Sequence, residues 1–106
     1  MDTPYVVQPD LLHALPDVSP DSILSRSIYK DARTDVTLFR FAAGQELSEH
    51  RSPAAAVIQV LEGELKLTLG GDEVTVKTGA WVYMPPNLPH SLYIPEHCLM
   101  LLSMLK

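Results

Sequence analysis

The chain has 106 residues, a mass of 11.7 kDa and a formal net charge of −5, from 8 basic and 13 acidic side chains. A chain of this length builds one domain, and we take residues 1–106 as a single unit. Its basic residues form no cluster, so neither nucleic acid nor an anionic membrane surface is an expected partner. The first residues lack a basic stretch and a long apolar run, which predicts no signal peptide and a cytoplasmic location.

The first twenty residues differ from the rest of the chain because prolines interrupt them repeatedly. Pro9, Pro16 and Pro20 leave room for one short helix over residues 10–15, with its leucines on one side. We therefore expect residues 1–33 to contain a short helical or extended segment followed by a first strand.

From Ser22 onward the sequence consists of short apolar runs separated by glycine, proline and aspartate. This pattern is typical of an all-β sandwich or barrel. The predicted strands cover residues 23–29, 36–41, 56–61, 65–69, 73–76, 81–84, 90–94 and 98–105.

One hairpin can be registered residue by residue. Gly70 and Gly71 form a two-residue loop that tolerates positive φ at both positions. Leu67 then lies opposite Val74, and the apolar residues of both strands share one face while the charged residues share the other. A shift of one residue would destroy this separation, so the register is well specified.

The last predicted strand, residues 98–105, carries apolar side chains on both faces. An antiparallel strand of this kind needs cover on both sides. Two covers remain open for its outer face: a second copy in a homodimer, or the N-terminal segment of the same chain.

The single cysteine, Cys98, excludes an internal disulfide and raises the question of a nucleophile. Its neighbour His97 points to the opposite face of a strand and is badly placed to activate it. We interpret Cys98 as a buried structural thiol. His13 and His97 are expected at the surface.

Glycines, histidines and a proline recur at characteristic spacings in two groups. The first group is Gly44, His50 and Gly63, and the second is Gly79, Pro85 and His90. These spacings resemble the two motifs of the cupin superfamily over roughly residues 34–105. The resemblance implies an all-β, double-stranded β-helix (jelly-roll) barrel, with a tight turn at residues 62–63.

The departures from the cupin motifs fall on the metal ligands. In metal-binding cupins, three histidines and one glutamate hold the ion. His50 and His90 match two of these histidines, whereas Ser52 and Ala56 stand at the places of the third histidine and the glutamate. Asn87 replaces a motif glycine, a mild change because asparagine tolerates the left-handed conformation. Two neutral imidazoles supply half of the usual donors and none of the charge.

The resemblance implies a ligand pocket inside the barrel. Its candidate lining residues are His50, Ser52, Ile58, Met84, His90 and Met100. An apolar pocket with two histidines and one hydroxyl suits a small organic molecule with one polar end. The alternative is that the apolar members fill the core of a narrow barrel.

The leading hypothesis is a small cupin that binds a small molecule in its lumen, with a reduced or absent metal site and a sensory or accessory role. The alternative is a metal-dependent enzyme of the dioxygenase, isomerase or decarboxylase type, with His50 and His90 holding zinc, nickel, iron or manganese. A purely structural dimerising domain is the third reading. Whether the protein is an enzyme stays open, because one barrel hosts many chemistries.

Overall fold

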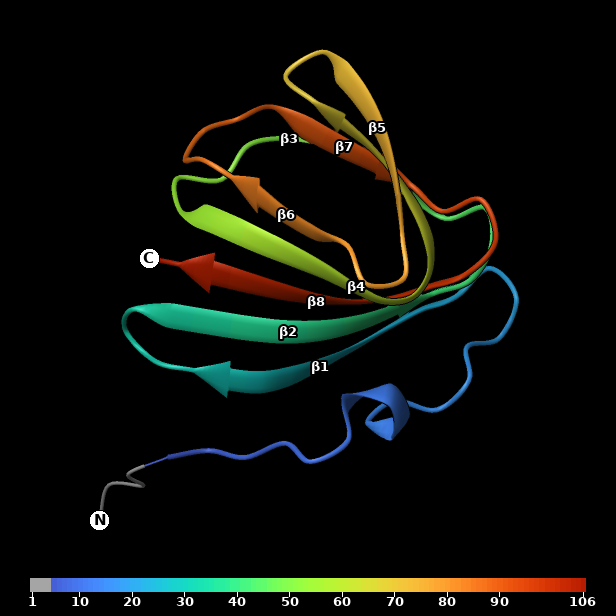
Figure 1. Cartoon of the computed structure of the whole chain (residues 1–106), viewed down its shortest axis with the longest axis vertical. Coiled ribbons are helices and arrows are strands. Elements are labelled where there is room, and N and C mark those ends of the chain that lie inside the picture. Colours follow the sequence, from blue (N-terminus) through green and yellow to red (C-terminus); the bar gives the residue numbers. More distant parts are fainter. Residues whose placement is uncertain (1–4) are drawn as a thin grey trace.

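The computed structural model of the protein describes residues 5–106, which form antiparallel strands wound into a curved barrel (Figure 1). One 3-10 turn precedes the strands. The elements in chain order are η1 (Leu11–His13), β1 (Ile23–Lys30), β2 (Thr34–Phe41), β3 (Glu46–His50), β4 (Ala55–Leu69), β5 (Asp72–Lys77), β6 (Trp81–Met84), β7 (His90–Tyr93) and β8 (Cys98–Leu105). In these residues no helix is long and apolar enough to cross a membrane.

Two sheets share the long strand β4. We call the strands β1-β2-β8-β4-β6 sheet A and the strands β5-β4-β7-β3 sheet B. The first part of β4 pairs with β8 and β6, and its last part pairs with β5 and β7. All pairings are antiparallel, which confirms the predicted all-β cupin-type barrel.

The expected turn at residues 62–63 is wrong, because β4 continues through it as one strand of 15 residues. A bulge between Val60 and Glu62 bends the strand there instead of reversing it. Gly63 adopts a φ of 95°, and a Cβ at this position would overlap the carbonyl oxygen of His97. The glycine therefore serves a bend with a close backbone approach, which carries β4 from sheet A into sheet B.

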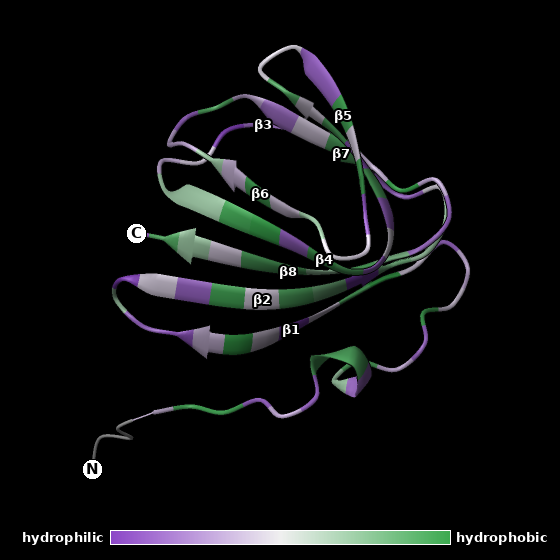
Figure 2. Cartoon of the chain, in the orientation of Figure 1, coloured by the Kyte–Doolittle hydropathy of each residue, from purple (hydrophilic) through white to green (hydrophobic). Residues whose placement is uncertain are grey.

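Strand β3 was not predicted from the sequence. Its residues, ELSEH, contain no β-branched side chain, and all five are exposed. The strand pairs with β7 at the edge of sheet B and is coloured as hydrophilic in Figure 2. Pairing with a neighbouring strand, rather than burial of an apolar face, thus accounts for β3.

The predicted hairpin is confirmed in register. Leu67 pairs with Val74, Leu69 pairs with Asp72, and the intervening Gly70 and Gly71 have φ values of 59° and 106°. Leu65, Leu67 and Val76 of this hairpin pack in the core, whereas Val74 is 38% exposed.

The core lies between the two sheets. Phe39 and Phe41 of β2 both face it, with their rings stacked at a centroid distance of 5.6 Å. The buried members of the cluster are Phe41, Ala56, Ile58, Val60, Leu65, Leu67, Met84, Leu92, Ile94, Cys98 and Met100. The barrel interior is therefore filled largely by its own apolar side chains.

The outer face of sheet A is covered at one end only. Leu38 and Leu99 face outward and have no exposed surface, and the N-terminal segment lies along this side of the barrel (Figure 1). Arg26 Nη1 donates to the carbonyl of Ala14 at 3.0 Å and ties this segment to the sheet. Leu105, at the other end of β8, is 49% exposed. The segment from the same chain thus supplies part of the cover that β8 requires.

The helix expected over residues 10–15 is reduced to the single 3-10 turn of η1. No side chain caps its N-terminus, and three residues are too few to bury an amphipathic face. The surface position expected for His13 is confirmed, since its side chain is exposed and lies 2.7 Å from Asp10.

Candidate functional site

The two histidines singled out by the motifs lie side by side at the β3–β7 edge of sheet B. His50 of β3 is paired directly with His90 of β7 in the strand register. Their ring centroids are 4.1 Å apart, and the rings meet edge to face at 62°. His90 is 8% exposed, whereas His50 is exposed. The pair therefore joins the barrel interior to the surface, and we call it the mouth pair.

A bulge in β3 produces this arrangement. The register shifts between Leu47 and His50, so one additional residue of β3 is accommodated opposite β7. Leu47 pairs with the core residue Leu92, and the shift returns His50 to the same inner face. Without the bulge, strand alternation would turn His50 away from His90.

Backbone carbonyls hold both rings in the same tautomer. Nδ1 of His50 lies 2.9 Å from the carbonyl oxygen of Ser48, and Nδ1 of His90 lies 2.9 Å from that of Leu88. A carbonyl oxygen only accepts hydrogen bonds, so each Nδ1 carries the proton. Each neutral ring therefore keeps an available lone pair on Nε2, the atom with which it contacts a ligand or an ion.

Ser52, at the place of the family's third histidine, belongs to the turn that precedes β4. Its hydroxyl oxygen accepts a hydrogen bond from the amide of Ala54 at 3.2 Å, and its carbonyl accepts one from Asn87 at 2.7 Å. Asn87 has a φ of 65°, which confirms that it takes over the left-handed conformation of the motif glycine. Ser52 thus links two loops, and its hydroxyl is engaged locally.

The apolar candidates for the pocket lie in the packed interior. Ile58, Met84 and Met100 are 1%, 3% and 2% exposed and belong to one cluster. The structure brings these three together, and separately brings together His50 and His90. The apolar side chains form the interior of the barrel, while the imidazoles lie at its mouth.

The donor set does not fit the four-ligand metal centre of the family. Ala56 is buried in the core and has no donor atom. Across residues 5–106, no group of three histidine, cysteine or acidic side chains is placed to hold a metal ion. The mouth pair offers two neutral nitrogens, so any ion held there would take its remaining ligands from water or from a bound molecule.

Cys98 is confirmed as a buried thiol. It has no exposed surface and lies in the core, whereas His97 is exposed on the outside of the barrel. Burial raises the pKa of the Cys98 thiol to about 12, so the group stays protonated at neutral pH. It is therefore not available as a nucleophile.

A hollow of about 510 Å³ lies on the outer face of sheet B, away from the mouth pair. Along β4 and β7, the polar side chains around it alternate with the buried Leu67 and Leu92. The polar residues that line it are Glu46, Ser48, Glu49, Lys66, Thr68, Glu73, Thr75, Ser91 and Tyr93. These include the polar face of the β4–β5 hairpin that the sequence placed in solvent, so this hollow is separate from the lumen.

The sequence reasoning missed the carbonyl groups of Ser48 and Leu88 and the buried position of Arg40. The carbonyls carry no residue-type signal, because any amino acid supplies one. Arg40 carried a weak signal, as a charged residue within the apolar run of residues 36–41.

Comparison with known proteins agrees with this fold. The family model described as "Cupin domain" matches residues 37–103. A conserved protein of unknown function from Streptococcus pyogenes is 30% identical, with a TM-score of 0.85, over 100% of this chain and 90% of that one. No curated protein matches the chain.

Two further solved structures extend the likeness. A cupin 2 conserved barrel domain protein from Leptotrichia buccalis is 29% identical with a TM-score of 0.84, over 90% of this chain and 46% of that one. The polyketide cyclase RemF from Streptomyces resistomycificus is 22% identical with a TM-score of 0.72, over 81% and 68%, and shares the fold alone. From the matching family model, the motif residues and the barrel itself, the chain belongs to the cupin superfamily.

Proposed function

We propose that this cupin binds a small organic molecule at the mouth of its barrel, with His50 and His90 as the polar contacts. The observation that carries the proposal is the edge-to-face pair of imidazoles, each held through Nδ1 by a backbone carbonyl. Two side chains held in one tautomer at the surface end of an apolar interior are suited to recognising the polar end of a ligand.

The chemistry of the two rings defines the ligand class. A neutral imidazole accepts a hydrogen bond at Nε2 from a hydroxyl or an amide, and a protonated one donates to a carboxylate. Leu69 lies opposite His90 in β4, and Leu47 on β3 is 37% exposed. These leucines would contact the apolar body of the same molecule. The ligand is therefore a small molecule with an apolar body and one polar or anionic end.

A metal-dependent reaction on the same histidines is the second candidate. The tautomer with its proton on Nδ1 favours this candidate, because it leaves the lone pair of Nε2 available to coordinate a divalent ion. The two-nitrogen donor set argues for the binding role instead, and a sensory or accessory function follows from that role. The cytoplasmic location stays a prediction from the sequence.

Imidazole NMR of uniformly labelled protein tests the binding proposal. Panels of small carboxylates, phenols and polyols are added, and the ring signals of His50 and His90 are expected to shift together on binding. His50→Gln and His90→Gln should weaken binding of the same compound, whereas His13→Gln, on the exposed 3-10 turn, should leave it unchanged. A compound that binds equally well to both mouth-pair variants would contradict the proposal.

We also propose that a second copy of this chain covers the bare end of sheet A. Trp81 is 62% exposed, Tyr83 is 49% exposed, and Leu105 is 49% exposed on the same outer face. Tyr5 and the two valines that follow it are also exposed, in a segment that extends away from the barrel (Figure 1). In a two-fold dimer, the segment of each copy can lie on the bare face of the other, so both apolar surfaces are buried at once.

Light scattering tests this partner. The protein is expected to have twice the 11.7 kDa mass of the chain, and Trp81→Lys is expected to return it to one chain. Tyr93→Lys places the same charge at another exposed aromatic, on the outer face of sheet B, and should leave the dimer intact. A single-chain mass for the unmodified protein would rule the dimer out.

A further inference from the structure

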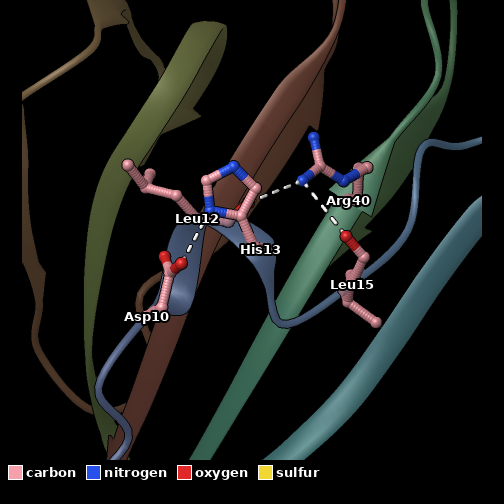
Figure 3. A network of polar contacts seen from close by, with 5 residues as sticks. All are labelled: Asp10, Leu12, His13, Leu15 and Arg40. Atoms are coloured by element: carbon pink, nitrogen blue, oxygen red, sulfur yellow. Dashed lines mark hydrogen bonds and ion pairs between the residues drawn. The ribbon is translucent and has the colours of Figure 1, made fainter.

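Arg40 is a buried arginine on the outer face of sheet A. It lies in β2, is only 8% exposed, and lies beneath the N-terminal segment. Its Nη2 donates to the carbonyl oxygen of Leu12 at 3.1 Å and to that of Leu15 at 3.4 Å (Figure 3). The guanidinium therefore fastens the segment around η1 to the barrel wall.

These two bonds leave most of the guanidinium without an acceptor. Nε is buried and has no hydrogen-bond partner among residues 5–106. The other terminal nitrogen, Nη1, donates to neither of these carbonyls and points away from the Leu15 carbonyl oxygen in Figure 3. No carboxylate of the described residues lies within 4.0 Å of Arg40, since the ion pairs found there involve other side chains. A buried cation with no carboxylate in direct contact is costly, and a bound anion would offset this cost.

The guanidinium opens onto a hollow between the barrel and the N-terminal segment. Arg40 lines a space of about 210 Å³ together with Asp17, Val18 and His97. Val18 and His97 also line an adjoining space of about 300 Å³. Arg40 thus lines a space that has the volume to hold a small ion.

We propose that this hollow binds a small oxyanion, a carboxylate or phosphate group, on Arg40. A guanidinium donates to such groups with two parallel N–H bonds, which suits the donors that Arg40 has left. His97 also lines the hollow, and its ring supplies a further N–H donor. The negative charge of Asp17, which also lines the hollow, repels the anion and lowers its affinity for the site.

The site is separate from the mouth pair. His50 and His90 face the lumen, whereas Arg40 and His97 line the outside of the same barrel. An anion on Arg40 would lie between the barrel wall and the stretch around Asp17 and Val18. The proposal thus adds a site for a second, charged ligand, and it stands whether or not the mouth pair binds a molecule.

An anion titration at constant ionic strength tests the proposal. Inorganic phosphate and acetate are each added in exchange for chloride, and the Arg40 Nε–H signal and the backbone amides of residues 12–18 are followed by NMR. Saturable shifts of these signals are expected. Saturation by phosphate alone identifies a phosphate site, and saturation by acetate identifies a carboxylate site.

Three variants make the test specific. Asp17→Asn removes the opposing charge and should tighten binding by roughly fivefold, and His97→Gln should weaken it by a similar factor. Asp72→Asn makes the same charge change in the distant β4–β5 hairpin and should change nothing. None of these side chains bonds to the carbonyls of the N-terminal segment, so the fold around Arg40 is retained.

The opposite result is equally clear. A non-saturating response that is the same in Asp17→Asn and Asp72→Asn would show that only general screening acts. Arg40 would then only hold the N-terminal segment against the barrel, and the proposal of an anion site would be overturned.

Discussion

The interior of the barrel and its mouth differ in the side chains that they contain. In the interior, Ile58, Met84 and Met100 are almost completely buried and belong to one apolar cluster. At the mouth, His50 and His90 are packed against each other and are held by carbonyl groups. The interior supplies stability, and the polar chemistry is concentrated at the mouth.

This difference explains why the cupin motifs alone did not define a metal centre. Two motif positions, Gly63 and Asn87, adopt positive φ values that fit glycine or asparagine. Two positions that would supply donors are instead a turn serine and a core alanine. Shape and metal chemistry are thus separable features of one fold.

The largest effect is expected when the mouth is given the family's ligands. The double variant Ser52→His with Ala56→Glu adds one imidazole and one carboxylate to the mouth pair. Zinc affinity should rise at least about 1000-fold, or about 4 kcal/mol, because the number of donors doubles. Isothermal titration with zinc measures this gain. An unchanged affinity would mean that these two positions do not converge on the histidines.

A smaller effect is expected from a cavity in the interior. Ile58→Ala removes a buried side chain and should lower the free energy of unfolding by about 3 kcal/mol. Leu47→Ala at the mouth removes a side chain that is 37% exposed and should cost less than about 1 kcal/mol. Urea unfolding compares the two variants. Equal costs would show that the mouth is as tightly packed as the interior.

The buried thiol gives a pH test of the interior. The pKa of Cys98 in the folded protein is about 12, above its ordinary value of 9.0, so the unfolded chain loses this proton first. The free energy of unfolding should therefore be intact below pH 9 and fall by about 2 kcal/mol by pH 10.5. Cys98→Ala is the control, since it removes this contribution at every pH. A fall of the same size in that variant would place its cause in other groups.

Much of the fold could be predicted because its signals are local. The hairpin around Gly70 follows from alternation and two glycines, and the inward face of β2 follows from Phe39 and Phe41. Strand β3 could not be predicted, since it is held by pairing with β7 and buries no apolar face. The sequence also did not predict that β4 is one continuous strand, because a glycine in a bent strand cannot be told from a glycine in a turn by sequence alone.

The residues of the candidate site could also be predicted only in part. Motif spacing brought out His50 and His90, which the structure places in contact. Their tautomer could not be predicted, because it depends on carbonyl groups that any residue provides. The buried charge of Arg40 was equally hidden, because it arises from the N-terminal segment that folds over a distant strand.

The central claim is that the mouth pair is a two-donor polar site and not a complete metal centre. Untagged protein is dialysed against excess zinc, passed through a desalting column, and assayed for metal per chain. The account predicts far less than one retained zinc per chain. One zinc retained per chain, and lost in both His50→Ala and His90→Ala, would contradict it.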